Sequence, residues 1–152
     1  MKNILILFFF ITPLISNAQP GWEKGDWENR AIGFWCSVGG SSTGLVVDMS
    51  DLFVSQDFDG IKEKLESKKA GERFLAAFLL ERLEQKKKLN LDESEIEKIR
   101  EIKKSEERVP VCSGCTYWER VPLNELMNKN HVIYRSAESW FKIYYKICYK
   151  RR

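Results

Sequence analysis

Hydrophobic and polar side chains alternate along residues 32–38, where every second residue is apolar. An aliphatic run follows at residues 45–47, and the residues between the two runs are all glycine, serine or threonine. Alternation is typical of a half-buried strand, and a Gly/Ser-rich segment between two such runs is typical of a turn. This part of the sequence therefore predicts a β-hairpin over residues 32–49.

The apolar residues in the middle of the chain follow a helical period. Phe58, Ile61 and Leu65 are spaced by three and four residues, which places them on one face of a helix. Residues 74–83 are apolar on nearly all sides, so we expect a second helix that is buried.

A third helix is predicted to begin after Asp92. The Asp92 side chain can cap the helix, and Glu95 stands at the position that completes a capping box. Ile96, Ile99 and Ile102 then form a narrow apolar stripe on an otherwise charged helix. The middle of the chain therefore supplies two to three helices.

Residues 73–80 read Arg-Phe-Leu-Ala-Ala-Phe-Leu-Leu, which is similar to the Arg–Ala–Ala–Leu pattern of a HEAT repeat. With the helix before it, the segment 57–88 resembles one HEAT-type helical hairpin. The resemblance covers a single unit, whereas a stacked solenoid needs three or more. It implies a helical hairpin and a role in protein binding.

The C-terminal part of the chain fits two periods. Five alternate positions are apolar, and they are Phe141, Ile143, Tyr145, Ile147 and Tyr149. This alternation of aromatic and β-branched residues favours a strand, with Ile133 and Tyr134 in its hairpin partner. A helix is the alternative, because another set of residues recurs at helical spacing, namely Trp140, Ile143, Tyr144 and Ile147.

The order of these elements predicts an α+β fold. Hairpins near 32–49 and 131–149 would form an antiparallel sheet, and the central helices would pack against it. Strands at both ends with helices between them give segregated rather than alternating elements.

The first 18 residues are typical of a secretory signal peptide. Lys2 precedes an apolar stretch at residues 4–15, and Ser16 and Ala18 are small residues at the positions that signal peptidase reads. The stretch is shorter than the roughly 20 residues needed to cross a bilayer. We therefore expect a signal peptide at 1–18 and a single exported domain at 19–152, periplasmic or secreted, that is not an integral membrane protein after cleavage.

The composition limits the possible chemistry. The chain is 43% hydrophobic and 31% charged with a net charge of +3, which excludes collagen-like, coiled-coil-only and wholly disordered chains. His131 is the single histidine, and no nucleophile or orienting carboxylate stands beside it in a catalytic pattern. Gly39 and Gly44 have the spacing of a phosphate-binding loop, but Leu45 replaces the required lysine. No catalytic residue, cofactor or metal is predicted.

The four cysteines are Cys36, Cys112, Cys115 and Cys148. An even number in an exported chain predicts disulfides. The spacing favours a local Cys112–Cys115 bridge, which leaves Cys36 to pair with Cys148. The alternative joins Cys36 to one cysteine of the CxxC motif and Cys148 to the other.

The CxxC motif at residues 112–115 has two further interpretations. A redox pair lowers the pKa of its first thiol at a helix N-terminus, but the strand-like residues 116–118 follow here. A zinc site would need a second pair of ligands, and Cys36, Cys148 and His131 stand at no recognised spacing. A structural bridge is the favoured interpretation.

The basic C-terminal segment is the predicted contact surface. Residues 129–152 carry seven basic residues and one acidic residue. On a strand, Lys142, Tyr144, Lys146 and Lys150 would share one solvent-facing side, whereas Phe141, Ile143, Tyr145, Ile147 and Tyr149 would face the core. The lysines would then either protect an edge strand from aggregation or attract an anionic surface.

These observations predict a small exported binding module that is non-catalytic. Its partner would be an unknown protein or an anionic component of the cell envelope, and export argues against nucleic acid. A thiol–disulfide protein that uses the CxxC motif is the alternative from another class. An inhibitor or immunity protein of the cell envelope is a third.

Overall fold

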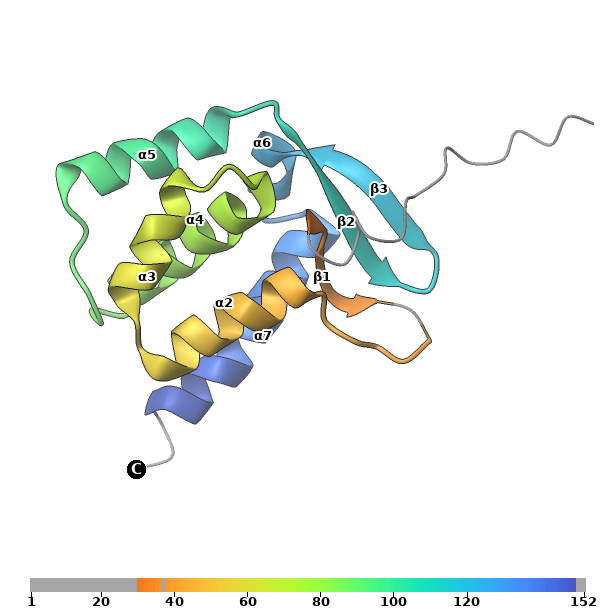
Figure 1. The fold of residues 1–152 in the computed structure, drawn as a ribbon, viewed down its shortest axis with the longest axis horizontal. Helices are drawn as coiled ribbons and strands as arrows, with labels where there is room; N and C mark the ends of the chain where they lie inside the picture. The colour runs from red at the N-terminus through yellow and green to blue at the C-terminus, as the bar shows by residue number, and fades with distance from the viewer. Residues whose placement is uncertain (1–29, 37, 150–152) are drawn as a thin grey trace, which may run out of the picture.

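The structure, a computed structural model, describes residues 30–36 and 38–149. The predicted signal peptide at 1–18 and Lys150 lie outside the described residues. Figure 1 shows the strands gathered on one side of the molecule and the helices on the other. In chain order the elements are β1 (Ile32–Cys36), α2 (Gly44–Ser55), α3 (Phe58–Glu63), the 3-10 helix η1 (Lys64–Glu66), α4 (Ala70–Gln85), α5 (Glu93–Lys104), β2 (Arg108–Gly114), β3 (Tyr117–Pro122), α6 (Leu123–Leu126) and α7 (Val132–Tyr149).

The three strands form a mixed sheet in the order β1-β2-β3, so the predicted α+β class is confirmed. β1 pairs in parallel with β2, and Ile32 lies opposite Val111. β2 then pairs antiparallel with β3, with Val109 opposite Val121. The predicted hairpin over 32–49 is wrong, because the partner of the first strand comes from a segment much later in the chain.

The aliphatic run at 45–47, predicted to be a strand, lies in helix α2. Thr43 determines where this helix begins. Its hydroxyl donates a hydrogen bond to the Ala31 carbonyl at 2.8 Å, and its own carbonyl accepts from the backbone N–H groups of Val46 and Val47. The helix buries one face, formed by Leu45, Val46, Met49, Ser50 and Phe53. Burial of this face outweighs the strand preference of three residues.

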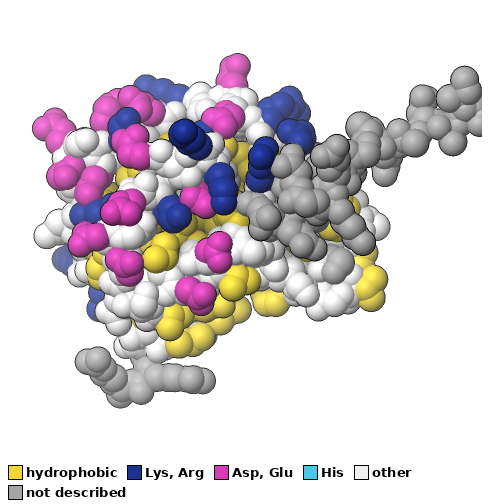
Figure 2. All heavy atoms as spheres, in the orientation of Figure 1, with side chains coloured by type: hydrophobic (Ala, Val, Ile, Leu, Met, Phe, Trp, Pro, Cys, Tyr) yellow, Lys and Arg dark blue, Asp and Glu magenta, His cyan; other side chains and the backbone are white. Residues whose placement is uncertain are grey.

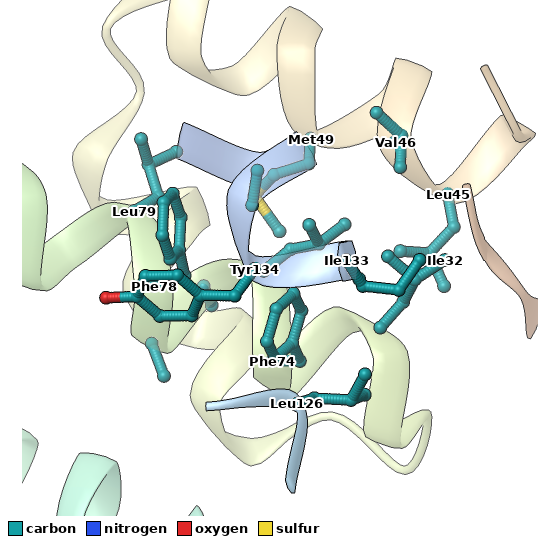
Figure 3. Close-up of a cluster of buried hydrophobic side chains, with 14 of the residues drawn as sticks. Ile32, Leu45, Val46, Met49, Phe74, Phe78, Leu79, Leu126, Ile133 and Tyr134 are labelled. Atoms are coloured by element: carbon teal, nitrogen blue, oxygen red, sulfur yellow. The ribbon is translucent and has the colours of Figure 1, made fainter. Parts of the chain in front are cut away.

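Helix α4 is the centre of the core, as its sequence predicts. Every residue from Phe74 to Leu80 is buried, so the helix is covered on all sides. Figure 3 shows Phe74, Phe78 and Leu79 of α4 beside side chains that come from β1, α2, α6 and α7. The core therefore joins both halves of the chain around one helix.

Side-chain caps mark the starts of two helices, and the one at α5 confirms the predicted capping box. The Asp57 side chain accepts a hydrogen bond from the Gly60 N–H at 3.0 Å and caps α3. At α5, Asp92 accepts from the Glu95 N–H at 2.9 Å while the Glu95 side chain accepts from the Asp92 N–H at 2.8 Å. Each cap satisfies backbone donors that the first turn of a helix leaves unpaired.

Residues 132–149, predicted to be mainly strand, form helix α7. Its buried residues recur at helical spacing, and they are Ile133, Tyr134, Ala137, Trp140 and Phe141. A helix satisfies its own backbone hydrogen bonds, whereas a strand here would need another free sheet edge. Two residues expected in the core, Ile143 and Ile147, are 45% and 39% exposed. The predicted hairpin over 131–149 is therefore wrong, and of its predicted core face only Phe141 is fully buried.

Helix α7 contacts both α2 and the first two strands of the sheet. Figure 1 shows α2 and α7 side by side along the lower edge of the molecule. Each helix in the described part of the chain is too short or too polar to span a bilayer.

Candidate functional site

Three of the four predicted contact residues lie on helix α7, and the helical period changes which of them share a side. Lys142 and Lys146 are exposed and stand one turn apart on the outer side of α7. Tyr144 does not join them, because its ring packs 6.5 Å from that of Phe53 on α2. Lys150 lies outside the described residues. Among the described residues of the predicted contact surface, only Lys142 and Lys146 are exposed, and their role in binding stays a prediction.

A hydrogen-bonded seam holds α7 against α2. The Trp140 indole N–H donates to the Ser50 hydroxyl at 2.9 Å, and that hydroxyl donates to the Val46 carbonyl at 2.7 Å. Both Ser50 and Trp140 are buried. The Phe53 ring lies 5.7 Å from that of Phe141, and the two rings are stacked. These contacts fix the relative positions of the two helices.

Exposed aliphatic side chains lie on both sides of this seam. Val47 and Val54 stand three residues before and four residues after Ser50, so they occupy the same side of α2 as that seam residue. Ile143 and Ile147 follow the inward-facing Trp140 and Tyr144 by three residues each on α7. Their exposed fractions are 46% for each valine, 45% for Ile143 and 39% for Ile147.

Charged side chains border this aliphatic strip with opposite signs. Asp48 and Asp51 are exposed on α2, and Lys142 and Lys146 are exposed on α7. Within the described part of the chain, none of the four takes part in an ion pair. Figure 2 shows acidic side chains above a group of hydrophobic side chains in the region that α2 occupies in Figure 1. We call the set of eight residues the α2–α7 face: Val47, Asp48, Asp51, Val54, Lys142, Ile143, Lys146 and Ile147.

The cysteines form a second candidate site, but their pairing differs from the favoured prediction. Cys36 and Cys112 form a disulfide between β1 and β2, with a Cα–Cα distance of 5.7 Å. The local Cys112–Cys115 bridge and the Cys36–Cys148 bridge are therefore wrong. The reason is tertiary, because the parallel register of β1 and β2 brings Cys36 and Cys112 together.

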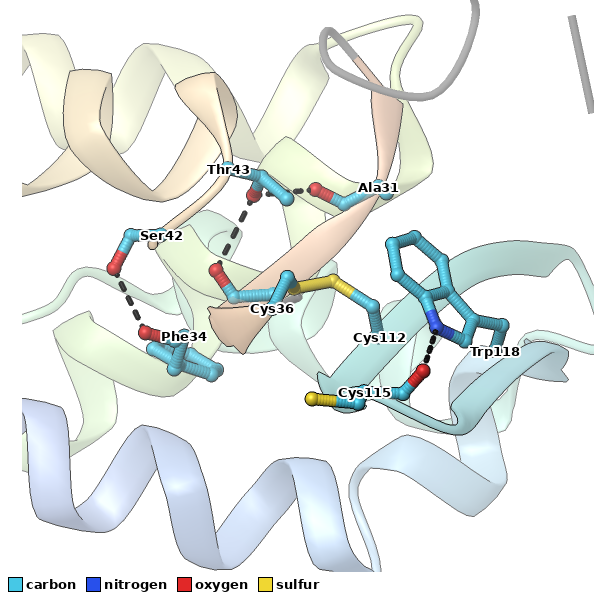
Figure 4. Close-up of a disulfide and its surroundings, with 9 residues drawn as sticks. Ala31, Phe34, Cys36, Ser42, Thr43, Cys112, Cys115 and Trp118 are labelled. Carbon is cyan, nitrogen blue, oxygen red and sulfur yellow. Dashed lines mark hydrogen bonds between the residues drawn. A yellow bond between two sulfur atoms is a disulfide. The ribbon is translucent and has the colours of Figure 1, made fainter. Parts of the chain in front are cut away.

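Gly33 makes room for this bridge. A Cβ at Gly33 would overlap the sulfurs of both Cys36 and Cys112. Both cysteines are buried, with exposed fractions of 7% and 0%. Figure 4 shows the bridge enclosed between the two strands, with Thr43 beside it. This environment is typical of a structural disulfide, since a redox-active pair lies at an accessible surface.

The other two cysteines are free. Cys115 is exposed on the turn between β2 and β3, and Figure 4 shows that it is not bonded to the nearby bridge. Cys148 is half-buried in α7, where its thiol lies 3.7 Å from the Phe53 carbonyl. Burial raises the pKa of the Cys148 thiol and lowers its reactivity. Cys115 is not at a helix N-terminus, because the strand β3 follows the turn directly.

His131 has a structural role at the start of α7. Its Nδ1 accepts a hydrogen bond from the Ile133 N–H at 3.2 Å, and its Nε2 lies 3.4 Å from the Tyr117 hydroxyl. Burial lowers the pKa of His131, although the nearby Glu125 and Glu119 carboxylates act in the opposite direction. With Nδ1 occupied by a backbone donor, only Nε2 is left for other chemistry.

A hollow of about 310 Å³ lies between η1, α4 and α5. Its basic side chains are already paired, since Arg73 contacts Glu107 and Lys98 contacts both Glu66 and Glu101. Such a site has no free charge to offer a ligand. Among the described residues, no cluster of three or more His, Cys, Asp or Glu side chains could hold a metal ion.

The sequence interpretation missed half of the α2–α7 face. The sequence pattern predicts a strand for Val47 and gives no signal for Val54, Asp48 or Asp51. The helical alternative for 140–147 contained a usable signal, because it grouped both isoleucines with Trp140. The α2 half had no such signal, since its position beside α7 depends on the fold.

Comparison with known proteins gives no further guide to this site. No family model, curated protein or solved structure matches the chain. The resemblance of residues 57–88 to a HEAT-type hairpin therefore stays a prediction.

Proposed function

We propose that this chain is a small exported, non-catalytic binding module that contacts a partner protein through the α2–α7 face. The observation that carries the proposal is the arrangement of exposed aliphatic residues on two adjacent helices. Val47 and Val54 continue the strip formed by Ile143 and Ile147 across the seam. A contiguous apolar strip with charged borders is typical of a protein interaction surface.

The rigidity of the seam supports this proposal. The Trp140–Ser50 hydrogen bond and the rings around Phe53 hold the two helices in one arrangement. A pre-organised face loses little conformational entropy on binding, so more of the contact energy remains as affinity. The bridge between Cys36 and Cys112 supports export, because disulfides persist mainly in oxidising compartments.

Site-specific photo-crosslinking tests the proposal. A photoreactive amino acid is placed at Ile143 in one variant and at Ile96 in another, in cells that naturally export the chain. Ile96 is the matched control, because it is 40% exposed on α5, away from the face. We expect a discrete protein adduct at Ile143 that is absent at Ile96 and is lost when Ile147 is changed to Ser.

Equal labelling at the two positions, or no adduct at Ile143, would contradict the proposed face. The mature chain should also begin at Gln19, which intact-mass measurement of exported material reports. A mass that includes residues 1–18 would remove the export part of the proposal.

A thiol–disulfide function is the second candidate, and the exposed thiol of Cys115 favours it. Attack of the Cys115 thiolate on the Cys112 sulfur would form a Cys112–Cys115 bond and release Cys36 as a thiolate. Peptide mapping after equilibration in a glutathione redox buffer tests this exchange. A linked Cys112–Cys115 peptide would support it, and an unchanged Cys36–Cys112 bridge would leave the disulfide with a structural role.

A further inference from the structure

The two borders of the α2–α7 face carry charges that complement each other. The α2 border is acidic, with Asp48 and Asp51, and the α7 border is basic, with Lys142 and Lys146. Between the borders the strip is aliphatic on both helices. A surface that is acidic along one edge and basic along the other is complementary to a copy of itself in the reversed orientation.

The direction of the two helices shows which orientation achieves this match. Ser50 contacts Trp140, and Phe53, one turn later on α2, contacts Cys148, two turns later on α7. The two helices therefore run in the same direction along the seam. A twofold axis parallel to the seam places α2 of one copy opposite α7 of the other at the same height. A twofold axis across the seam would instead place lysines opposite lysines.

The ion pairs in such a dimer follow from the helical rise of 1.5 Å per residue. Asp51 lies one residue beyond Ser50, and Lys142 lies two residues beyond Trp140, which contacts Ser50. The two charges therefore differ in height by about 1.5 Å along the helix axes, well within the reach of a lysine side chain. Lys146 lies one turn further along the same border.

The size of the face predicts a weak dimer. Helix α2 has 12 residues and is about 18 Å long, and two adjacent helices are about 20 Å wide. The area of the face is therefore about 360 Å². This is smaller than the roughly 800 Å² that each partner buries in a stable complex. We therefore expect dissociation in the micromolar range or weaker, with strong salt dependence from the bordering charges.

From this complementarity we infer that the partner at the α2–α7 face is a second copy of this chain. The inference rests on the proposed function, because it names the occupant of the same face. A membrane surface fits less well, since anionic headgroups would meet the aspartates of α2 as well as the lysines of α7. A different protein would not require opposite signs on the two borders.

Charge reversal with purified mature chains tests the inference. One variant carries Asp48→Lys and Asp51→Lys, so that both borders are basic. The other carries Lys142→Glu and Lys146→Glu, so that both borders are acidic. All four positions are exposed, so circular dichroism should report the wild-type helix content in each variant.

Analytical ultracentrifugation across a concentration series measures the result. We expect the wild type to dimerise at low salt, each variant alone to be monomeric, and an equimolar mixture of the two to form a 1:1 heterodimer. The dissociation constant of the mixed complex should rise at least tenfold when the salt is raised from 0.05 M to 0.5 M, because salt screens the bordering charges. Only self-recognition through opposite borders predicts that two monomeric variants restore each other.

A wild-type chain that stays monomeric up to millimolar concentration would overturn the dimer. The proposed binding function would then depend on the crosslinked adduct at Ile143. An adduct with the mass of another protein would keep the binding function and reject self-association. Binding to vesicles of 30% anionic lipid that increases in the all-basic variant would identify a membrane surface instead.

Discussion

Replacing Cys36 and Cys112 together by alanine should lower the free energy of unfolding by about 4–5 kcal/mol. The bridge links residues that are 76 positions apart in sequence. In the loop-entropy model, breaking a bridge that closes a loop of this size raises the conformational entropy of the unfolded chain. This stabilises the unfolded state by about 4.5 kcal/mol. The loss is large compared with the 5–15 kcal/mol total stability of a typical domain.

Urea unfolding followed by tryptophan fluorescence measures this loss, since Trp140 is buried at the seam. With a denaturant dependence of about 2 kcal/mol per molar urea, the midpoint should fall by about 2 M. The matched control is Cys115→Ala, which changes an exposed free thiol and leaves the bridge intact. Its midpoint should equal that of the wild type.

Two results would refute this reasoning. The first is an unchanged midpoint in the double alanine variant, which would mean that no bridge joins β1 to β2. The second is a fall of the midpoint in Cys115→Ala, which would indicate a local bridge between Cys112 and Cys115. Such a small ring would contribute only about 2 kcal/mol, so the size of the loss also distinguishes the two pairings.

Two further predictions concern single positions. Gly33→Ala places a Cβ against both disulfide sulfurs, so it should lower the free energy of unfolding in urea by about 1–3 kcal/mol. This loss should shrink when Cys36 and Cys112 are alanine. An equal loss in both backgrounds would contradict the overlap. Burial lowers the pKa of His131 in the folded chain, so the unfolded chain binds its proton more readily and stability should fall as pH drops below about 6.5. Because His131 is the single histidine, His131→Gln should flatten the stability profile between pH 7.5 and 5.5, and an unchanged slope would show that His131 is not the group responsible.

Local interactions in this chain could be predicted from the sequence. The capping box of Asp92 and Glu95 and the cap at Asp57 depend on groups only three residues apart. The burial of residues 74–80 follows from their composition, because a helix that is apolar on all sides must be covered. The α+β class was predicted as well, although its strands were partly misplaced.

The tertiary structure decided whether the ambiguous segments form helices or strands. It also decided which cysteines pair and which residues make up the α2–α7 face. Residues 45–47 and 141–149 have strand-like composition, and only their burial around Phe53 and Trp140 makes the helix the more stable choice. The pairing of Cys36 with Cys112 depends on the parallel register of β1 and β2. In each case the deciding contact joins residues far apart in the chain, so its energy is absent from any local window of sequence.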